Sequence, residues 1–271
     1  MAAVEVTAPA RARGTRDWVV VATQELRDLW IGGRGMLLCF AFSLLLGALA
    51  YLSATNEALN FLERREAVSL MVQVTVAVGA LLALLAGADA ISGERERGTL
   101  ETLLLTPVSR RHIATGKLVV ALTLWFATFA ITVPYVWLLG RGVAIVGDAL
   151  AVGLVVGTLL AVFLTSLGVV LSIFAASNRV SLSLSLFILF ALFAPTLFPT
   201  GARQGWAGDF LYRTNPMTAG EDYVGKIVVS GHAWSQDLSL LVSPLVAAVV
   251  CAAVAAILSA GFIHLRGGVS G

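Results

Sequence analysis

The residue types that could do chemistry are concentrated in one charged segment, residues 93–111, which reads GERERGTLETLLLTPVSRR. Neither of the two Gly-Lys pairs in the chain has the spacing of a phosphate-binding P-loop. The histidines lie far apart, without cysteine or carboxylate partners at metal-ligand spacing; they are His112, His232 and His264. The sequence therefore predicts no catalytic residue, no metal site and no cofactor bound by this chain.

An intramembrane serine protease is the enzyme class of suitable size that needs separate consideration. Its chemistry requires a serine nucleophile and a histidine base inside the helices. The G-x-S-x-G pattern is absent, and no histidine lies in the middle of a long apolar run. The residues argue against this class, and cleavage of a generic transmembrane substrate would be the observation that restores it.

The elements that must position the charged segment are strongly apolar. The chain has 271 residues, of which 58% are hydrophobic and 13% charged, whereas soluble domains have about 25% charged residues. A net charge of +2 gives no support for binding nucleic acid. Since a membrane span needs about 20 apolar residues, the composition predicts a polytopic membrane protein with one domain over residues 1–271.

Six apolar runs are long enough to cross a bilayer as helices. The runs lack the alternation of barrel strands, so the predicted fold is all-α. Twelve of the 18 lysines and arginines fall on the side that holds both termini, which predicts cytoplasmic termini by the positive-inside rule. The expected spans are residues 36–53, 67–91, 118–139, 147–176, 181–200 and 238–263.

Two features of the apolar part concern helix packing and the membrane surface. Residues 16–33 have apolar and polar faces at helical spacing, which suits either an interfacial amphipathic helix or a plain lead-in to the first span. The patterns Gly153-x-x-x-Gly157 and Ser181-x-x-x-Ser185 indicate close helix contact, within one subunit or between two.

The charged segment lies in a loop, residues 92–117, between the second and third spans. Gly98 is expected to end the helix that continues the second span, because glycine accepts the left-handed conformation. A short helix then starts at Thr99, with an apolar stripe on one face, and Pro107 stops it. Such a stripe suits either a groove on a partner protein or the lipid headgroup layer; it is formed by Leu100, Leu103 and Leu104.

The run ISGERERGTLETLLLTPVSRRHIATGK, residues 91–117, resembles the first cytoplasmic loop of ABC-2 type transporter permeases. The resemblance implies that the short helix is a coupling helix docked on a separate ABC-type ATPase subunit, which binds ATP and Mg. It also implies two ATPase copies and a second permease copy, as a homodimer. The implied coupling residues are Glu94, Arg97, Gly98, Thr99, Leu100, Glu101, Leu103, Leu104, Thr106 and Pro107.

The resemblance extends more loosely to an enlarged external loop, residues 201–237, before the last span. Its many aromatic residues indicate one or two short helices that dip into the outer leaflet, forming either a gate or a cap over the path. The candidate outer gate consists of Trp206, Phe210, Asn215 and Pro216. The layout is similar to permeases of the nitrous-oxide-reductase maturation, sodium-efflux and drug or peptide export types.

These observations predict a permease subunit of an exporter in the plasma membrane. The spans contain hydroxyl and amide side chains but no charge at mid-membrane, which favours a hydrophobic or amphipathic cargo over a bare ion. The alternative is a membrane scaffold or sensor that transports nothing and whose loop binds a regulatory partner. A neighbouring reading frame with a Walker A motif would distinguish the two.

Overall fold

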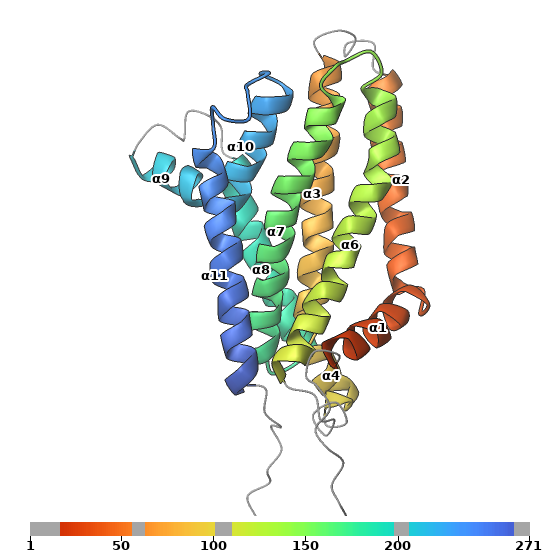
Figure 1. Cartoon of the computed structure of the whole chain (residues 1–271), viewed down its shortest axis with the longest axis vertical. Coiled ribbons are helices and arrows are strands. Elements are labelled where there is room, and N and C mark those ends of the chain that lie inside the picture. The colour runs from red at the N-terminus through yellow and green to blue at the C-terminus, as the bar shows by residue number, and fades with distance from the viewer. Residues whose placement is uncertain (1–16, 56–62, 101–109, 198–205, 263–271) are drawn as a thin grey trace, which may run out of the picture.

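The computed structural model describes residues 17–55, 63–100, 110–197 and 206–262. Within these ranges every regular element is a helix (Figure 1). In chain order the elements are α1 (Asp17–Trp30), α2 (Arg34–Thr55), α3 (Glu63–Asp89), α4 (Ser92–Arg97), α6 (Arg110–Leu139), α7 (Val146–Phe174), α8 (Asn178–Phe193), the 3-10 turn η2 (Ala194–Leu197), α9 (Trp206–Thr214), α10 (Pro216–Val228) and α11 (Ser239–Phe262).

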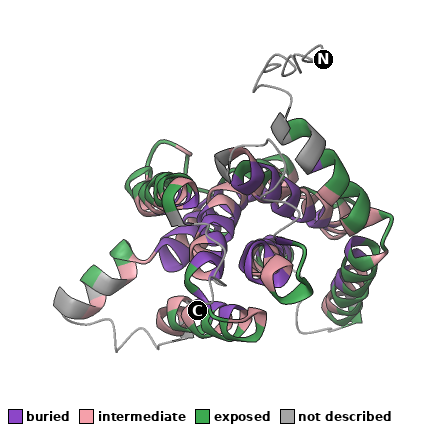
Figure 2. Cartoon of the chain, turned by 90° about the horizontal axis from the view of Figure 1, so that it is seen from below, coloured by how far each residue is buried: buried purple, intermediate pink, exposed green. Residues whose placement is uncertain are grey.

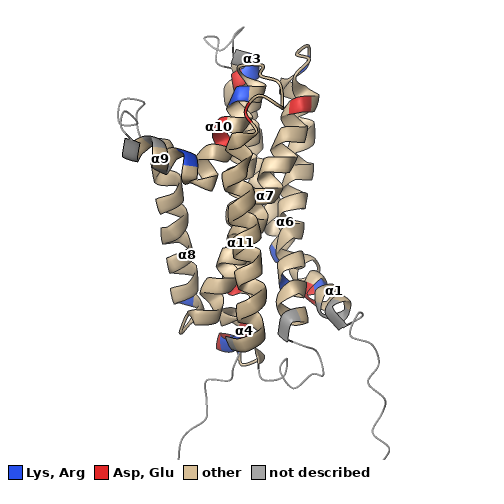
Figure 3. Cartoon of the chain, turned by 60° about the vertical axis from the view of Figure 1, so that its left-hand side comes forward, with Lys and Arg blue, Asp and Glu red and all other residues tan. Residues whose placement is uncertain are grey.

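Six of these helices are long and apolar enough to cross a membrane: α2, α3, α6, α7, α8 and α11. A helix satisfies its backbone hydrogen bonds internally, as the hydrocarbon layer requires. The all-α fold with six spans, predicted from the apolar runs, is therefore confirmed. Charged residues gather at the two ends of the bundle (Figure 3). We call these the α4 end, which also carries α1, and the α10 end.

Helices α3 and α7 form the centre of the bundle. Buried residues make up 61% of the apolar window of α3 and 56% of that of α7, but only 17% in α8 and α11. The peripheral helices consequently present broad exposed faces, as the view along the bundle shows (Figure 2). Two helices that pack on many neighbours in this way fix the positions of everything attached to their ends.

Glycines let the central helices approach at backbone contact. A Cβ atom added to Gly87 would lie 2.4 Å from the carbonyl oxygen of Thr165, and one added to Gly168 would lie 2.5 Å from that of Leu84. Any side chain at these two positions would push α3 and α7 apart. The glycine pair therefore sets the spacing of these helices near the α4 end.

A second set of glycines encloses the indole of Trp125 in α6, which is fully buried. Added Cβ atoms would lie 2.0 Å from the ring at Gly157 and 2.6 Å from it at Gly79. The Gly153-x-x-x-Gly157 pattern thus serves contacts within the chain, because Gly153 packs on Val72 of α3. Between-subunit contact was the other reading of that pattern.

Helix α1 lies obliquely across the α4 end and packs on α6 and α2 (Figure 1). The indole Nε1 of Trp30 donates to Thr123 Oγ1 of α6 at 3.3 Å, and Ala22 is buried. The segment expected to be an interfacial helix or a lead-in is therefore anchored to the third span.

Candidate functional site

The charged segment begins with the short helix α4, which follows α3 after a turn at residues 90–91. Gly98 ends α4 in the left-handed conformation, with φ of 72°, and its N–H donates to Arg95 O. The predicted helix end at Gly98 is confirmed. Thr99 folds back onto α4 as well, because its backbone N–H donates to Glu94 O at 3.0 Å.

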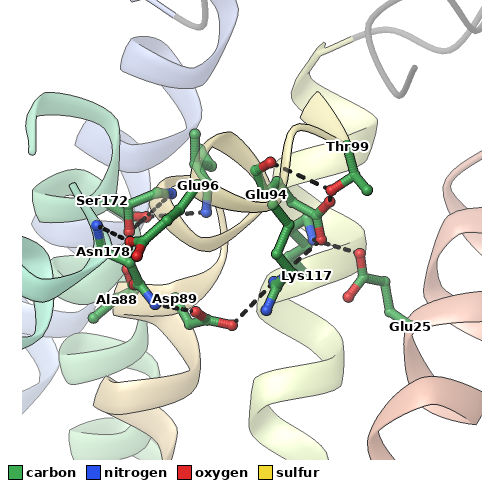
Figure 4. A network of polar contacts seen from close by, with 12 residues as sticks. Glu25, Ala88, Asp89, Glu94, Glu96, Thr99, Lys117, Ser172 and Asn178 are labelled. Carbon is green, nitrogen blue, oxygen red and sulfur yellow. Dashed lines mark hydrogen bonds and ion pairs between the residues drawn. The ribbon is translucent and has the colours of Figure 1, made fainter. Parts of the chain in front are cut away.

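A buried lysine joins three helices at this point (Figure 4). The Nζ of Lys117 in α6 lies 3.2 Å from Glu94 Oε1 of α4, and it also pairs with Glu25 of α1. The Lys117 side chain is only 5% exposed. A charge withdrawn from water needs such partners, since an unpaired buried ammonium would be costly. The three residues therefore form one ionic contact between α1, α4 and α6.

The carboxylate of Glu94 is the centre of this cluster. Burial by itself raises the pKa of Glu94, but the charge of Lys117 and hydrogen bonds from Thr99 and Lys117 lower it, and the net pKa lies below the ordinary value. Arg97 adds a weaker contact, 3.5 Å from Glu94 and 3.3 Å from Asp89. Because Arg97 is 42% exposed, this pair contributes little to stability.

A second polar network ties the start of α4 to α7 and α8. Ser172 Oγ of α7 accepts the backbone N–H groups of Ile91 at 2.9 Å and Ser92 at 2.8 Å. Asn178 at the start of α8 accepts from Ser92 Oγ at 3.0 Å and donates to Asp89 at 2.6 Å. These contacts satisfy buried backbone donors that the turn before α4 leaves unpaired.

Two further contacts fix α4 against the loop between α7 and α8. The guanidinium of Arg95 donates to Ala175 O at 2.6 Å, and the Glu96 carboxylate accepts the backbone N–H of Asn178 at 3.0 Å. Helix α4 is therefore bonded to four other helices, namely α1, α6, α7 and α8. A segment with so many contacts cannot move without moving the ends of those helices.

The structure differs from the sequence-based expectation at two residues beside α4. Leu100 was expected on a stripe that the chain leaves uncovered, but it is 5% exposed and packs among Ile91, Val169 and Ile173. Lys117 was expected to extend toward the membrane surface, but the carboxylates of α1 and α4 hold it inside the protein. The remaining coupling residues lie outside the described residues: Glu101, Leu103, Leu104, Thr106 and Pro107.

The sequence matches the model of a protein family described as ABC-2 family transporter protein over residues 19–262. The match includes the whole described bundle and the α4 network. The chain belongs to this family. The permease is accordingly a multi-pass membrane subunit of an ABC transporter and is not itself catalytic, and its family implies a partner ATPase subunit. No curated protein matches the sequence.

At the α10 end, the permease folds its enlarged loop into α9 and α10. The amide of Asn215 caps α10 by accepting the N–H of Met217 at 2.9 Å and donates to Leu192 O at 2.7 Å. Pro216 is buried at the first position of α10, where proline is well suited. Asn215 and Pro216 thus hold α10 in place. Of the two aromatic gate candidates, Phe210 is exposed, and the Trp206 side chain lies outside the described residues.

Helix α10 lies inside the bundle of the permease, packed on α7, α11 and α3. Tyr223 is fully buried and donates to Trp234 O at 2.9 Å. The sequence had placed such rings at the membrane interface. Glu221 is the residue that the sequence analysis overlooked. Burial raises its pKa to about 7, and it forms no hydrogen bond or ion pair with any described residue.

Proposed function

We propose that the permease is driven through α4 and the segment after it by a separate ABC-type ATPase. The observation that carries this proposal is the set of contacts from α4 to α1, α6, α7 and α8. A force applied beyond Gly98 would reach these helices through α4. The segment after Gly98 is the part of the loop that resembles a coupling helix, and its leucines at 103 and 104 are the proposed docking surface.

We place the coupling movement in the ends of α3 and α8. Asn178 of α8 is bonded to Asp89 of α3 and to Ser92 of α4, so these three helices would shift together. In the proposed mechanism, two ATPase copies bind ATP and Mg, approach each other, and displace α4 in each copy of a permease homodimer. The substrate path would lie between the two copies.

The cargo proposed for this exporter is hydrophobic or amphipathic. Buried polar residues within the described spans are mostly serine and threonine, and the buried Lys117 is near the α4 end and already paired. Such a lining offers hydrogen bonds without a fixed charge, which suits an amphipathic molecule better than an ion. The proposed location is the plasma membrane, with the α4 end and both termini cytoplasmic.

The test is co-purification from native membranes. Tagged permease should retain a subunit that carries a Walker A motif and should hydrolyse ATP in the eluate. The double variant Glu101→Arg and Leu104→Glu should lose that subunit while its thermal unfolding stays unchanged. Arg65→Glu, at the α10 end, is the matched control and should retain the subunit.

Two outcomes would contradict the proposal. Retention of the ATPase at the wild-type level by the double variant would show that the leucine segment is not the docking surface. A loop partner without nucleotide-binding motifs would favour the alternative function, a scaffold or sensor that transports nothing. Equal loss by Arg65→Glu would assign the effect to general disruption of the permease.

A further inference from the structure

The exposed face of α8 contains a shallow hollow at its start, near the α4 end. The hollow has a volume of about 410 Å³ and is lined by Arg179, Val180, Ser183 and Leu184. Figure 3 shows a basic segment at the lower end of α8. One cation and one hydroxyl therefore border a surface that is otherwise aliphatic.

Arg179 is the unsatisfied group of this hollow. It forms no ion pair or hydrogen bond with any residue in the described ranges. The nearest carboxylates have other partners, since Asp89 binds Arg97 and Asn178 and Glu96 binds the Asn178 N–H. The first turn of a helix is also an unfavourable place for a cation, because of the helix dipole. Helix stability thus gives no reason for an arginine here.

The backbone at the start of α8 does not supply the anion-binding groups. The N–H of Asn178 donates to Glu96, and the N–H of Val180 donates to Ser177 Oγ. An anion in the hollow would therefore be bound by side chains, the Arg179 guanidinium and the Ser183 hydroxyl. Guanidinium binds phosphate oxygens with strong charge-assisted hydrogen bonds.

An apolar stripe continues from the hollow along α8. Phe187 and Phe190 follow Val180 and Leu184 at helical spacing and are each 70% exposed. At 1.5 Å per residue, the ten residues from 180 to 190 span about 15 Å, which is about half of a 30 Å hydrocarbon layer. The stripe thus has the length of one lipid leaflet and starts at a cation.

We propose that this face of α8 is a binding site for an anionic phospholipid. The lipid phosphate lies in the hollow against Arg179 and Ser183, and an acyl chain lies along Leu184, Phe187 and Phe190. Charge complementarity selects an anionic over a zwitterionic headgroup, in which the choline cation already neutralises the phosphate. The site does not depend on the ATPase, so it stands or falls separately from the proposed function.

The experiment is native mass spectrometry of the full-length permease in detergent with defined lipids. The probes are dioleoylphosphatidylglycerol and dioleoylphosphatidylcholine. Wild-type permease should retain the anionic lipid preferentially, and Arg179→Gln should reduce that preference about tenfold, as loss of one charge-assisted contact implies. Ser183→Ala should reduce it less, because a neutral hydroxyl contributes less. Thermal unfolding establishes that each variant is folded.

The matched control is Arg34→Gln. Arg34 starts α2 at the same end of the bundle, is exposed, and has no partner among the described residues, but it does not border the hollow. It should keep the wild-type preference. Equal loss by Arg34→Gln, or no loss by Arg179→Gln, would overturn the proposal, because either result means non-specific attraction to surface charge.

A competition arm identifies the source of the anion. Inorganic phosphate should displace the lipid far less effectively than decyl phosphate, since the apolar stripe contributes to binding only when a chain is attached. If both competitors act equally, the hollow takes a soluble anion and the lipid proposal is wrong. Phe187→Ala should weaken decyl phosphate and leave inorganic phosphate unchanged.

Discussion

The ammonium of Lys117 in α6 lies 3.2 Å from the carboxylate of Glu94 in α4, inside the protein and not at its surface. Glu25 of α1 completes the contact. Breaking a buried ion pair by removing one partner leaves an uncompensated charge, which costs more than a surface pair contributes. The contact therefore couples the position of α4 to α1 and α6.

Replacing the lysine should destabilise the α4 end. Lys117→Met keeps most of the volume but leaves Glu94 and Glu25 without their cation, and we expect a loss of about 3 kcal/mol. Thermal unfolding of purified protein measures this as a lower Tm. The triple variant that also carries Glu25→Gln and Glu94→Gln should regain part of the loss. An unchanged Tm in Lys117→Met would mean that the contact is not formed.

Ser172 should be the critical hydroxyl of α7. Its Oγ accepts two buried backbone N–H groups, so Ser172→Ala leaves donors unsatisfied and should cost about 1–3 kcal/mol. Ser166, on the same helix, is buried and its hydroxyl has no hydrogen-bond partner in the described part of the chain. Ser166→Ala should therefore be close to neutral. Equal Tm values for the two variants would contradict the assigned role of Ser172.

The enclosure of Trp125 makes Gly157 intolerant of substitution. A Cβ atom there would lie 2.0 Å from the indole ring, and the overpacking in Gly157→Ala should cost about 1–3 kcal/mol or more. Gly147, also in α7, has open space around its added Cβ, so Gly147→Ala is the matched control. The blue-shifted fluorescence of a buried tryptophan should change only in the first variant, and identical Tm values would refute the close contact.

Glu221 should make stability depend on pH. Burial raises its pKa to about 7, so the folded state binds a proton that the unfolded chain releases at about pH 4.5. Stability from this group is fully present below the unfolded pKa and is lost as pH rises to about 7. The Tm should therefore be higher at pH 5.5 than at pH 8, and Glu221→Gln should reduce that difference.

The matched control for the pH experiment is Glu66→Gln. Glu66 belongs to α3 at the same end of the bundle and is exposed, so its replacement should leave the pH dependence as in the wild type. If Glu221→Gln shows the full wild-type dependence, the carboxylate of Glu221 is not the titrating group.

Hydropathy predicted the six spans because each apolar run has to meet lipid or another apolar helix. The helix end at Gly98 was equally readable, since glycine marks left-handed backbone. The pairing of Lys117 with Glu25 was not, because the two residues are 92 positions apart and a lysine near a span end looks the same whether it faces water or a carboxylate.

The burial of α10 was the larger omission. The aromatic residues of the loop fitted a membrane interface, and a single sequence does not say which neighbours cover them. Tyr223 is buried because α7, α3 and α11 surround α10, which is a tertiary property. The same reasoning applies to Leu100, whose covering residues come from α3, α7 and α11.

The enclosure of Lys117 leaves the permease with one reactive side-chain amine. The chain contains two lysines, and the other, Lys226, lies at the α10 end with 34% of its side chain exposed. A membrane-impermeant succinimidyl ester added to intact cells should thus modify Lys226 alone if that end faces outward. A single labelling reaction, read by peptide mapping, would establish the topology of the whole chain.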